Sequence, residues 1–179
     1  SSRRHFLKLG GVATAYGAFG SVMIGGAGDP ALGLILIPVD PSIPPDARVL
    51  YPSGVRFLVN GVGLRGMTLE GCDEAIPRVV PRAQELAKQR ARDISVSGSS
   101  LTFYKGAKFH DDLITQVGKA TGRLATTQSN GLLDGLRAAN ARRIALATAY
   151  TDVVTERLMI FLQEYGFEVT SAMGLGFEV

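Results

Sequence analysis

The sequence has few of the residue types from which disulfide frameworks and metal sites are built. Its 179 residues include one cysteine, two histidines and no tryptophan. A single cysteine excludes a disulfide framework within the chain, and two histidines are too few for a zinc site made of Cys and His clusters. We therefore expect that any chemistry of this chain needs no metal.

The sequence also has little net charge. Arg3, Arg4 and Lys8 against Asp29 account for +2 of the formal charge of +3, so the rest of the chain has 16 basic and 15 acidic residues. No basic stripe is left to bind a phosphate backbone, and we expect no nucleic-acid partner. Because 46% of the residues are hydrophobic, the chain can bury a core.

Residues 1–30 have the layout of an export signal. Paired arginines precede Phe6-Leu7-Lys8, and an uncharged stretch of residues 9–28 follows. This pattern resembles a twin-arginine signal and predicts a periplasmic location, with membrane contact only through the signal. Cleavage is expected near residues 27–31. An ordinary first helix or a membrane anchor is the alternative, which seven glycines in residues 10–28 disfavour.

Strands and helices alternate in the rest of the chain. Short apolar runs predict strands at residues 34–37, 55–59, 94–96, 124–126, 143–149 and 167–171. Helices are expected at 68–90, 107–121, 130–139 and 153–165, the first interrupted at Pro77 and Pro81. The proline-rich stretch 40–52 is expected to be irregular. This alternation predicts an α/β fold with a parallel sheet and right-handed crossovers.

Hydroxyl groups follow two of the predicted strands. Residues 97–100 read Ser-Gly-Ser-Ser, and Tyr150 follows the strand that ends at Ala149. Ligands of open parallel sheets bind outside the carboxyl ends of the strands, and neutral hydrogen-bond donors there suit a small carboxylate. The alternative is that the serines only cap a turn.

Three other motifs indicate structure and not chemistry. Residues 61–66 match G-x-G-x-x-G, but they follow the second predicted strand, and Leu86 stands where a dinucleotide site needs an acidic residue. Adjacent residues on a helix point in different directions, so His110 and Asp111 are expected on a helix surface and not in a catalytic triad. Cys72 is expected to be a small buried residue, although its place in the first turn of a helix could lower its pKa.

Longer runs carry a family resemblance. Residues 98–106 (GSSLTFYKG), 130–137 (NGLLDGLR) and 142–150 (RRIALATAY), with 50–52 (LYP) and 68–71 (TLEG), resemble the arylmalonate decarboxylase family. This family belongs to the aspartate/glutamate racemase and maleate cis-trans isomerase superfamily. The likeness extends from about residue 33 to the end of the chain.

The resemblance implies two pseudo-symmetric, flavodoxin-like lobes, each with a four-stranded parallel sheet. Residues 31–140 would form the first lobe and residues 141–179 the first part of a second, incomplete lobe. The implied reaction is the cofactor-independent decarboxylation of a malonate-type dicarboxylate through an enediolate. Hydroxyls of Ser99, Ser100 and Tyr150, with backbone N–H groups, would hold the retained carboxylate. The implied substrate-binding residues are Gly98, Pro38, Val39, Leu64, Met67 and Cys72, of which all but Gly98 form an apolar pocket for the carboxylate that leaves.

Two positions depart from relatives in this superfamily. Gly98 stands where racemases and isomerases have a cysteine, which favours decarboxylation. Cys72 stands where the decarboxylase has a tyrosine, which changes the pocket wall. The family's proton-donating cysteine lies in a Cys-Gly-Gly stretch expected beyond residue 179, so we expect a fragment of a longer exported protein that is inactive without that stretch. The alternatives are a maleate isomerase or Asp/Glu racemase, and an exported non-catalytic carboxylate-binding protein.

Overall fold

The computed structural model describes residues 30–51 and 53–177. The expected export signal lies almost entirely outside the described residues. Within the described part of the chain, no helix has the length and apolar character needed to cross a membrane.

A four-stranded parallel sheet forms the centre of the fold. Its strands are β1 (Ala31–Leu36), β2 (Arg56–Gly61), β3 (Asp93–Val96) and β4 (Leu124–Thr127), in the spatial order β2-β1-β3-β4. β1 lies between two neighbours, with Leu34 opposite Val59 on β2 and Ser95 on β3. Its continuous apolar run is buried, as is usual for an interior parallel strand. The predicted α/β class with a parallel sheet is confirmed.

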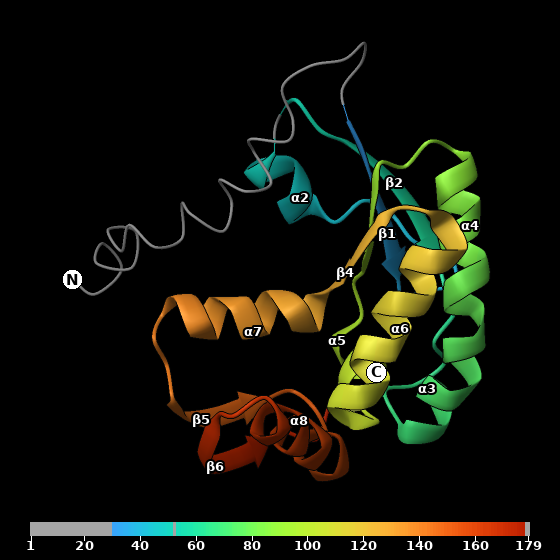
Figure 1. Ribbon diagram of the computed structural model, residues 1–179. Helices are drawn as coiled ribbons and strands as arrows, with labels where there is room; N and C mark the ends of the chain where they lie inside the picture. Colours follow the sequence, from blue (N-terminus) through green and yellow to red (C-terminus); the bar gives the residue numbers. More distant parts are fainter. Residues whose placement is uncertain (1–29, 52, 178–179) are drawn as a thin grey trace.

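Two helices pack along one face of this sheet (Figure 1). They are α4 (Val79–Lys88) and α6 (Gly106–Thr121), which also contact each other. α4 buries Val79, Ala83 and Leu86, the spacing that places apolar residues on one face of a helix. α6 ends at Gly122, whose φ of 63° is a left-handed conformation that glycine adopts readily.

The predicted helix at 68–90 is interrupted, as expected, but at one proline only. α3 (Leu69–Ala75) begins at Thr68, whose hydroxyl accepts a hydrogen bond from Gly71 N at 3.1 Å. A 3-10 turn, η2 (Ile76–Arg78), contains Pro77. Pro81 lies in the first turn of α4, where a backbone N–H has no partner within the helix, so α4 continues through it.

The last part of the chain forms a second sheet. β5 (Arg143–Thr148) and β6 (Glu168–Gly174) pair in parallel and are joined by α8 (Asp152–Glu164). α7 (Gln128–Ala138) leads from β4 toward this sheet (Figure 1). α8 packs against β6 and also against α5 (Ser99–Phe103) and α6, so it joins the second sheet to the first.

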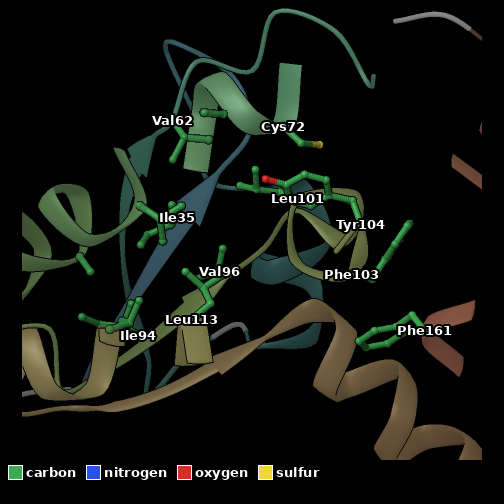
Figure 2. Close-up of a cluster of buried hydrophobic side chains, with 14 of the residues drawn as sticks. Ile35, Val62, Cys72, Ile94, Val96, Leu101, Phe103, Tyr104, Leu113 and Phe161 are labelled. Atoms are coloured by element: carbon green, nitrogen blue, oxygen red, sulfur yellow. The ribbon is translucent and has the colours of Figure 1, made fainter. Parts of the chain in front are cut away.

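A single apolar core spans both parts. Figure 2 shows Phe161 of α8 beside Phe103 of α5, and their ring centroids are 6.1 Å apart. Both rings are at most 1% exposed. The contact of α8 with α5, a helix of the first part, is therefore a packed interior.

Three sequence predictions were wrong in detail. The stretch 40–52 contains the helix α2 (Pro45–Leu50), which begins with proline at its first position, where proline is favoured. Ser99 and Ser100 were expected in a loop after the strand, but they begin the short helix α5. His110 is 1% exposed and not on a helix surface, because the C-terminal end of α8 covers this face of α6.

Candidate active site

Two hydroxyl groups meet where β3 and β5 end. β3 leads through Gly98 into α5, and β5 leads through Tyr150 into α8. The Ser99 Oγ and Tyr150 Oη atoms lie 2.6 Å apart, although 51 residues separate them in the chain. The fold therefore brings the two predicted loops together at one point.

Ser99 is held by two hydroxyls that the sequence predictions did not single out. Its carbonyl oxygen accepts hydrogen bonds from Thr102 Oγ1 at 2.9 Å and Ser129 Oγ at 3.4 Å. Thr102 Oγ1 and Ser129 Oγ also lie 2.6 Å apart, so one of the two hydroxyls shares its proton between this contact and the carbonyl, and both residues are fully buried. The spacing of three residues between Ser99 and Thr102 was a signal, since it places them on the same turn of a helix. The contact with Ser129 depends on packing of α5 against α7.

Tyr150 is held from both sides. Its ring packs edge-on against Phe103, with centroids 5.8 Å apart and planes at 65°. Its carbonyl accepts a hydrogen bond from Gly176 N at 3.0 Å. A Cβ atom at Gly174 would lie 2.5 Å from that carbonyl, so the close approach of β6 requires glycine. Both hydroxyls of the pair thus have fixed backbones.

Ser100, the next residue, makes a different contact. It is 3% exposed, and its hydroxyl hydrogen-bonds the thiol of Cys72 on α3. Burial raises the pKa of the Cys72 thiol to about 11, and the hydrogen bond from Ser100 opposes the rise only partly. The alternative that the helix N-terminus lowers this pKa therefore does not hold, and the thiol is protonated at neutral pH. The expected burial of Cys72 is confirmed.

Charges near Cys72 compensate each other. Asp73 Oδ1 accepts a hydrogen bond from Tyr104 Oη at 3.0 Å and lies 2.5 Å from Lys105 Nζ. The hydrogen bonds from Lys105 and Tyr104 hold the pKa of Asp73 below its usual value. Burial, followed by the bond to Asp73, raises the pKa of Tyr104. The carboxylate is thus already paired beside the candidate site.

The predicted apolar residues lie on two adjacent loops and on α3. Pro38 and Val39 are exposed on the loop after β1, and Leu64 and Met67 are half-buried after β2. The two loops are joined by hydrogen bonds from Gly63 N to the Pro38 carbonyl at 3.3 Å and from Leu64 N to the Ile37 carbonyl at 2.7 Å.

Gly98 is buried and packs tightly. A Cβ atom there would lie 2.5 Å from Ile37 Cγ2 at the end of β1. Glycine at this position therefore lets β3 and the loop after β1 approach each other. Among residues 30–51 and 53–177, no group of three or more His, Cys, Asp or Glu side chains could hold a metal ion.

The Ser99–Tyr150 pair can act as a hydrogen-bond donor site. Each hydroxyl donates one proton, so when one donates to the other, the second remains available for a bound oxygen anion. Such donors stabilise negative charge that develops in a reaction if they are held in place beforehand. The fixed backbones of Ser99 and Tyr150 provide this condition.

Comparison with known proteins points to one family. Residues 32–179 match the arylmalonate decarboxylase family. The arylmalonate decarboxylase of Bordetella bronchiseptica is 44% identical over 150 residues, which cover 84% of this chain and 62% of that protein. The chain thus spans about three fifths of the length of this relative.

Solved structures agree with the sequence comparison. A double mutant of arylmalonate decarboxylase in its liganded form has a TM-score of 0.81 and 43% identity, covering 83% of this chain and 63% of that one. A maleate cis-trans isomerase of Nocardia farcinica, a cysteine-to-serine mutant, has a TM-score of 0.76 at 19% identity, covering 84% and 65%, and so shares the fold. Together with the match over residues 32–179, these comparisons show that the chain belongs to the arylmalonate decarboxylase family.

Proposed function

We propose that this chain is the carboxylate-binding part of a carboxy-lyase that decarboxylates a malonate-type dicarboxylate without a cofactor. The observation that carries the proposal is the 2.6 Å contact between Ser99 Oγ and Tyr150 Oη at the carboxyl ends of two parallel strands. The family to which the chain belongs supports the reaction class.

In the proposed reaction, the substrate has two carboxylates on one carbon atom. Ser99, Tyr150 and nearby backbone N–H groups hold the carboxylate that stays. The bond from the central carbon to the other carboxylate breaks, CO2 leaves, and the electron pair moves into the retained group to form an enediolate. Negative charge on the retained oxygens increases in this step, so donors fixed beside them stabilise the transition state more than the substrate.

The carboxylate that leaves is proposed to lie against Pro38, Val39, Leu64, Met67 and Cys72, because an apolar surface favours neutral CO2 over a charged group. Ser100 is proposed to act through this wall, since its hydroxyl bonds the Cys72 thiol. The proton that completes the reaction would come from the Cys-Gly-Gly stretch expected after residue 179.

The packing at Gly98 favours decarboxylation over isomerisation or racemisation. A cysteine there would need Ile37 to move, because its Cβ atom would lie 2.5 Å from Ile37 Cγ2. A nucleophile or base at this position is therefore poorly accommodated by the surrounding packing.

The test uses the full-length protein, with the second-lobe sequence that we propose to follow residue 179. Incubation with phenylmalonate should release CO2, and Tyr150→Phe should lose most of this activity while Tyr51→Phe, outside the site, keeps it. Turnover of maleate with no CO2 release would favour an isomerase. Binding of phenylmalonate without turnover of either compound would favour a carboxylate-binding protein.

We also propose that residues 1–30 direct export by the twin-arginine pathway. The support is the Arg3-Arg4 pair followed by Phe6-Leu7-Lys8 and the uncharged stretch of residues 9–28. Replacing both arginines by lysine should keep the full-length protein in the cytoplasm of a bacterium with this pathway. Unchanged periplasmic recovery would contradict the proposal.

A further inference from the structure

The C-terminal end of α8 is attached to the first two turns of α6 by polar contacts that include neither Ser99 nor Tyr150. Glu164 Oε2 accepts a hydrogen bond from Ala107 N at 2.6 Å, and Tyr165 Oη donates to Asp111 Oδ1 at 2.6 Å. His110 Nδ1 lies 2.9 Å from Tyr165 Oη. We call these contacts the α6–α8 clasp.

Glu164 completes the N-terminus of α6. Lys105, the residue before this helix, provides no side-chain cap. The Glu164 carboxylate supplies the missing acceptor from another part of the chain, where the helix dipole favours negative charge. Gly106 has a φ of 85°, and a Cβ atom there would lie 2.6 Å from Glu164 Oε2, so glycine permits the contact.

His110 extends the clasp into the interior. Its Nε2 atom lies 2.8 Å from Thr127 Oγ1, which caps α7 by accepting from Asn130 N at 2.9 Å. Because Tyr165 donates to Asp111, it accepts from His110 Nδ1. In the neutral ring, which the lowered pKa of His110 favours, Nε2 then accepts from Thr127, whose one proton is shared with Asn130 Oδ1 at 3.3 Å. One ordered chain of hydrogen bonds thus connects the start of α7, the first turn of α6 and the end of α8.

Aromatic rings pack closely around this end of α8. The Phe161 ring lies 5.2 Å from the His110 ring and 4.9 Å from the Tyr165 ring. Phe161 also contacts Phe103, whose other neighbour is the Tyr150 ring at 5.8 Å. The clasp and the hydroxyl pair are therefore joined by α8 itself and by this row of rings.

The hydroxyl pair and the clasp lie at opposite ends of α8. Tyr150 and Thr151 precede the helix, and Tyr165 follows it after 13 helical residues. At 1.5 Å per residue, the helix is about 20 Å long, so a tilt of roughly 3° at the clasp moves the other end by about 1 Å. A shift of that size can lower the rate of a reaction that depends on precise geometry by about 10²-fold.

We propose that Glu164, His110 and Tyr165 are positioning residues that hold α8 so that the Tyr150 hydroxyl meets Ser99. The proposal rests on the function proposed above. It predicts that a substitution that loosens the clasp lowers kcat by about tenfold to a hundredfold and changes KM less. A misplaced Tyr150 hydroxyl reduces the stabilisation of the transition state more than it reduces the binding of substrate.

The first experiment needs no substrate. In the full-length chain, tyrosine rings are labelled with ¹³C, and the Tyr150 signal is assigned by its loss in Tyr150→Phe. Glu164→Ala and Tyr165→Phe should each shift or broaden this signal. Glu164→Gln, which keeps an acceptor for Ala107 N, should restore it, and Glu156→Ala, on an exposed position of the same helix, should leave it unchanged.

An unchanged Tyr150 signal in Glu164→Ala would overturn the proposal. Because Glu164 is exposed, this variant is expected to fold even if Tyr165→Phe does not. Failure of the proposed function would be seen separately, as absence of CO2 release from the unmodified chain.

The second experiment separates positioning from stability. Glu164→Ala should lower kcat in the unmodified chain but have little further effect in a Tyr150→Phe background, because the residue acts through that hydroxyl. If Glu164→Ala lowered kcat by the same factor in both backgrounds, the proposal would be contradicted.

Discussion

The Ser99 and Tyr150 hydroxyls lie 2.6 Å apart, yet they come from different sheets. Ser99 follows β3 of the four-stranded sheet, and Tyr150 follows β5 of the two-stranded sheet. The packing of α8 on α5 brings them together. A site at this contact depends on both sheets and on the helix between them.

Removing either hydroxyl should remove one donor to the developing negative charge. We expect Ser99→Ala and Tyr150→Phe each to lower kcat for phenylmalonate about 10²–10³-fold, since the loss of one such donor costs about 2.7–4 kcal/mol. Steady-state measurement of CO2 release tests this. Ser97→Ala is the matched control, because the Ser97 hydroxyl bonds Ser95 at 3.3 Å instead. Rates within twofold of the unmodified chain in both site variants would mean that these hydroxyls do not take part in the reaction.

Because Gly98 packs tightly against Ile37, substitutions at these two residues should have interdependent effects on stability. Gly98→Ala should lower the free energy of unfolding by about 1–3 kcal/mol, because the new Cβ atom meets Ile37 Cγ2. Ile37→Ala removes that methyl group, so the loss caused by Gly98→Ala should be smaller in its presence. Denaturant unfolding measures both.

Gly131→Ala is the control for this pair, since nothing lies within 4 Å of a Cβ atom at that position on α7. It should leave the free energy of unfolding unchanged or raise it slightly, because alanine favours a helix more than glycine does. If the decreases in the free energy of unfolding caused by Ile37→Ala and Gly98→Ala simply add in the double variant, the predicted contact would be contradicted.

His110 should make stability depend on pH. Burial holds the pKa of His110 below its usual 6.5, although nearby Asp111 opposes this shift. Below about pH 6.5, the unfolded chain binds a proton at His110 that the folded chain does not. The free energy of unfolding should therefore fall as the pH falls from 6.5 toward the folded pKa, by at most about 1.4 kcal/mol per pH unit, and this contribution should be constant above pH 7.

Comparison with His110→Gln isolates this effect. The variant should be less stable at pH 7 but should show a shallower fall between pH 7 and 5, measured by denaturant unfolding at each pH. Parallel curves for the two proteins would show that folding does not change the pKa of His110.

Cys72 should react slowly with thiol reagents. It is 2% exposed and its pKa is raised to about 11, so only about one thiol in a thousand is ionised at pH 8. We expect iodoacetamide to modify Cys72 at least a hundredfold more slowly than glutathione. Peptide mass spectrometry at residue 72 measures the rate, and labelling in denaturant, where burial is lost, provides the reference. A rate near that of glutathione would show that the thiol is accessible.

Much of the fold could be predicted from local patterns. The apolar runs at 34–37 and 94–96 and the glycine after 121 identify strands and a helix end, because each depends on neighbouring residues alone. The helix at Pro45–Leu50 was missed because prolines usually mark irregular chain, whereas here Pro45 occupies the one helical position that favours it.

Less of the candidate site could be predicted. The hydroxyls at 99 and 150 were singled out because both follow predicted strands. Ser100 was grouped with them, but the α5 backbone turns its side chain toward Cys72. Of the two residues that hold the Ser99 carbonyl, Thr102 had a signal in its spacing of three residues from Ser99, whereas Ser129 had none because it lies on another helix.

The sequence by itself determined the α/β class and the family, because both depend on the order and spacing of residues along the chain. Tertiary structure alone decided that Ser99 meets Tyr150 and that His110 is buried under Tyr165. The physical reason is the same in both cases. α8 packs against helices that precede it by about 50 residues. Which partner a side chain contacts therefore depends on the helix that packs opposite it, and the local sequence does not specify that helix.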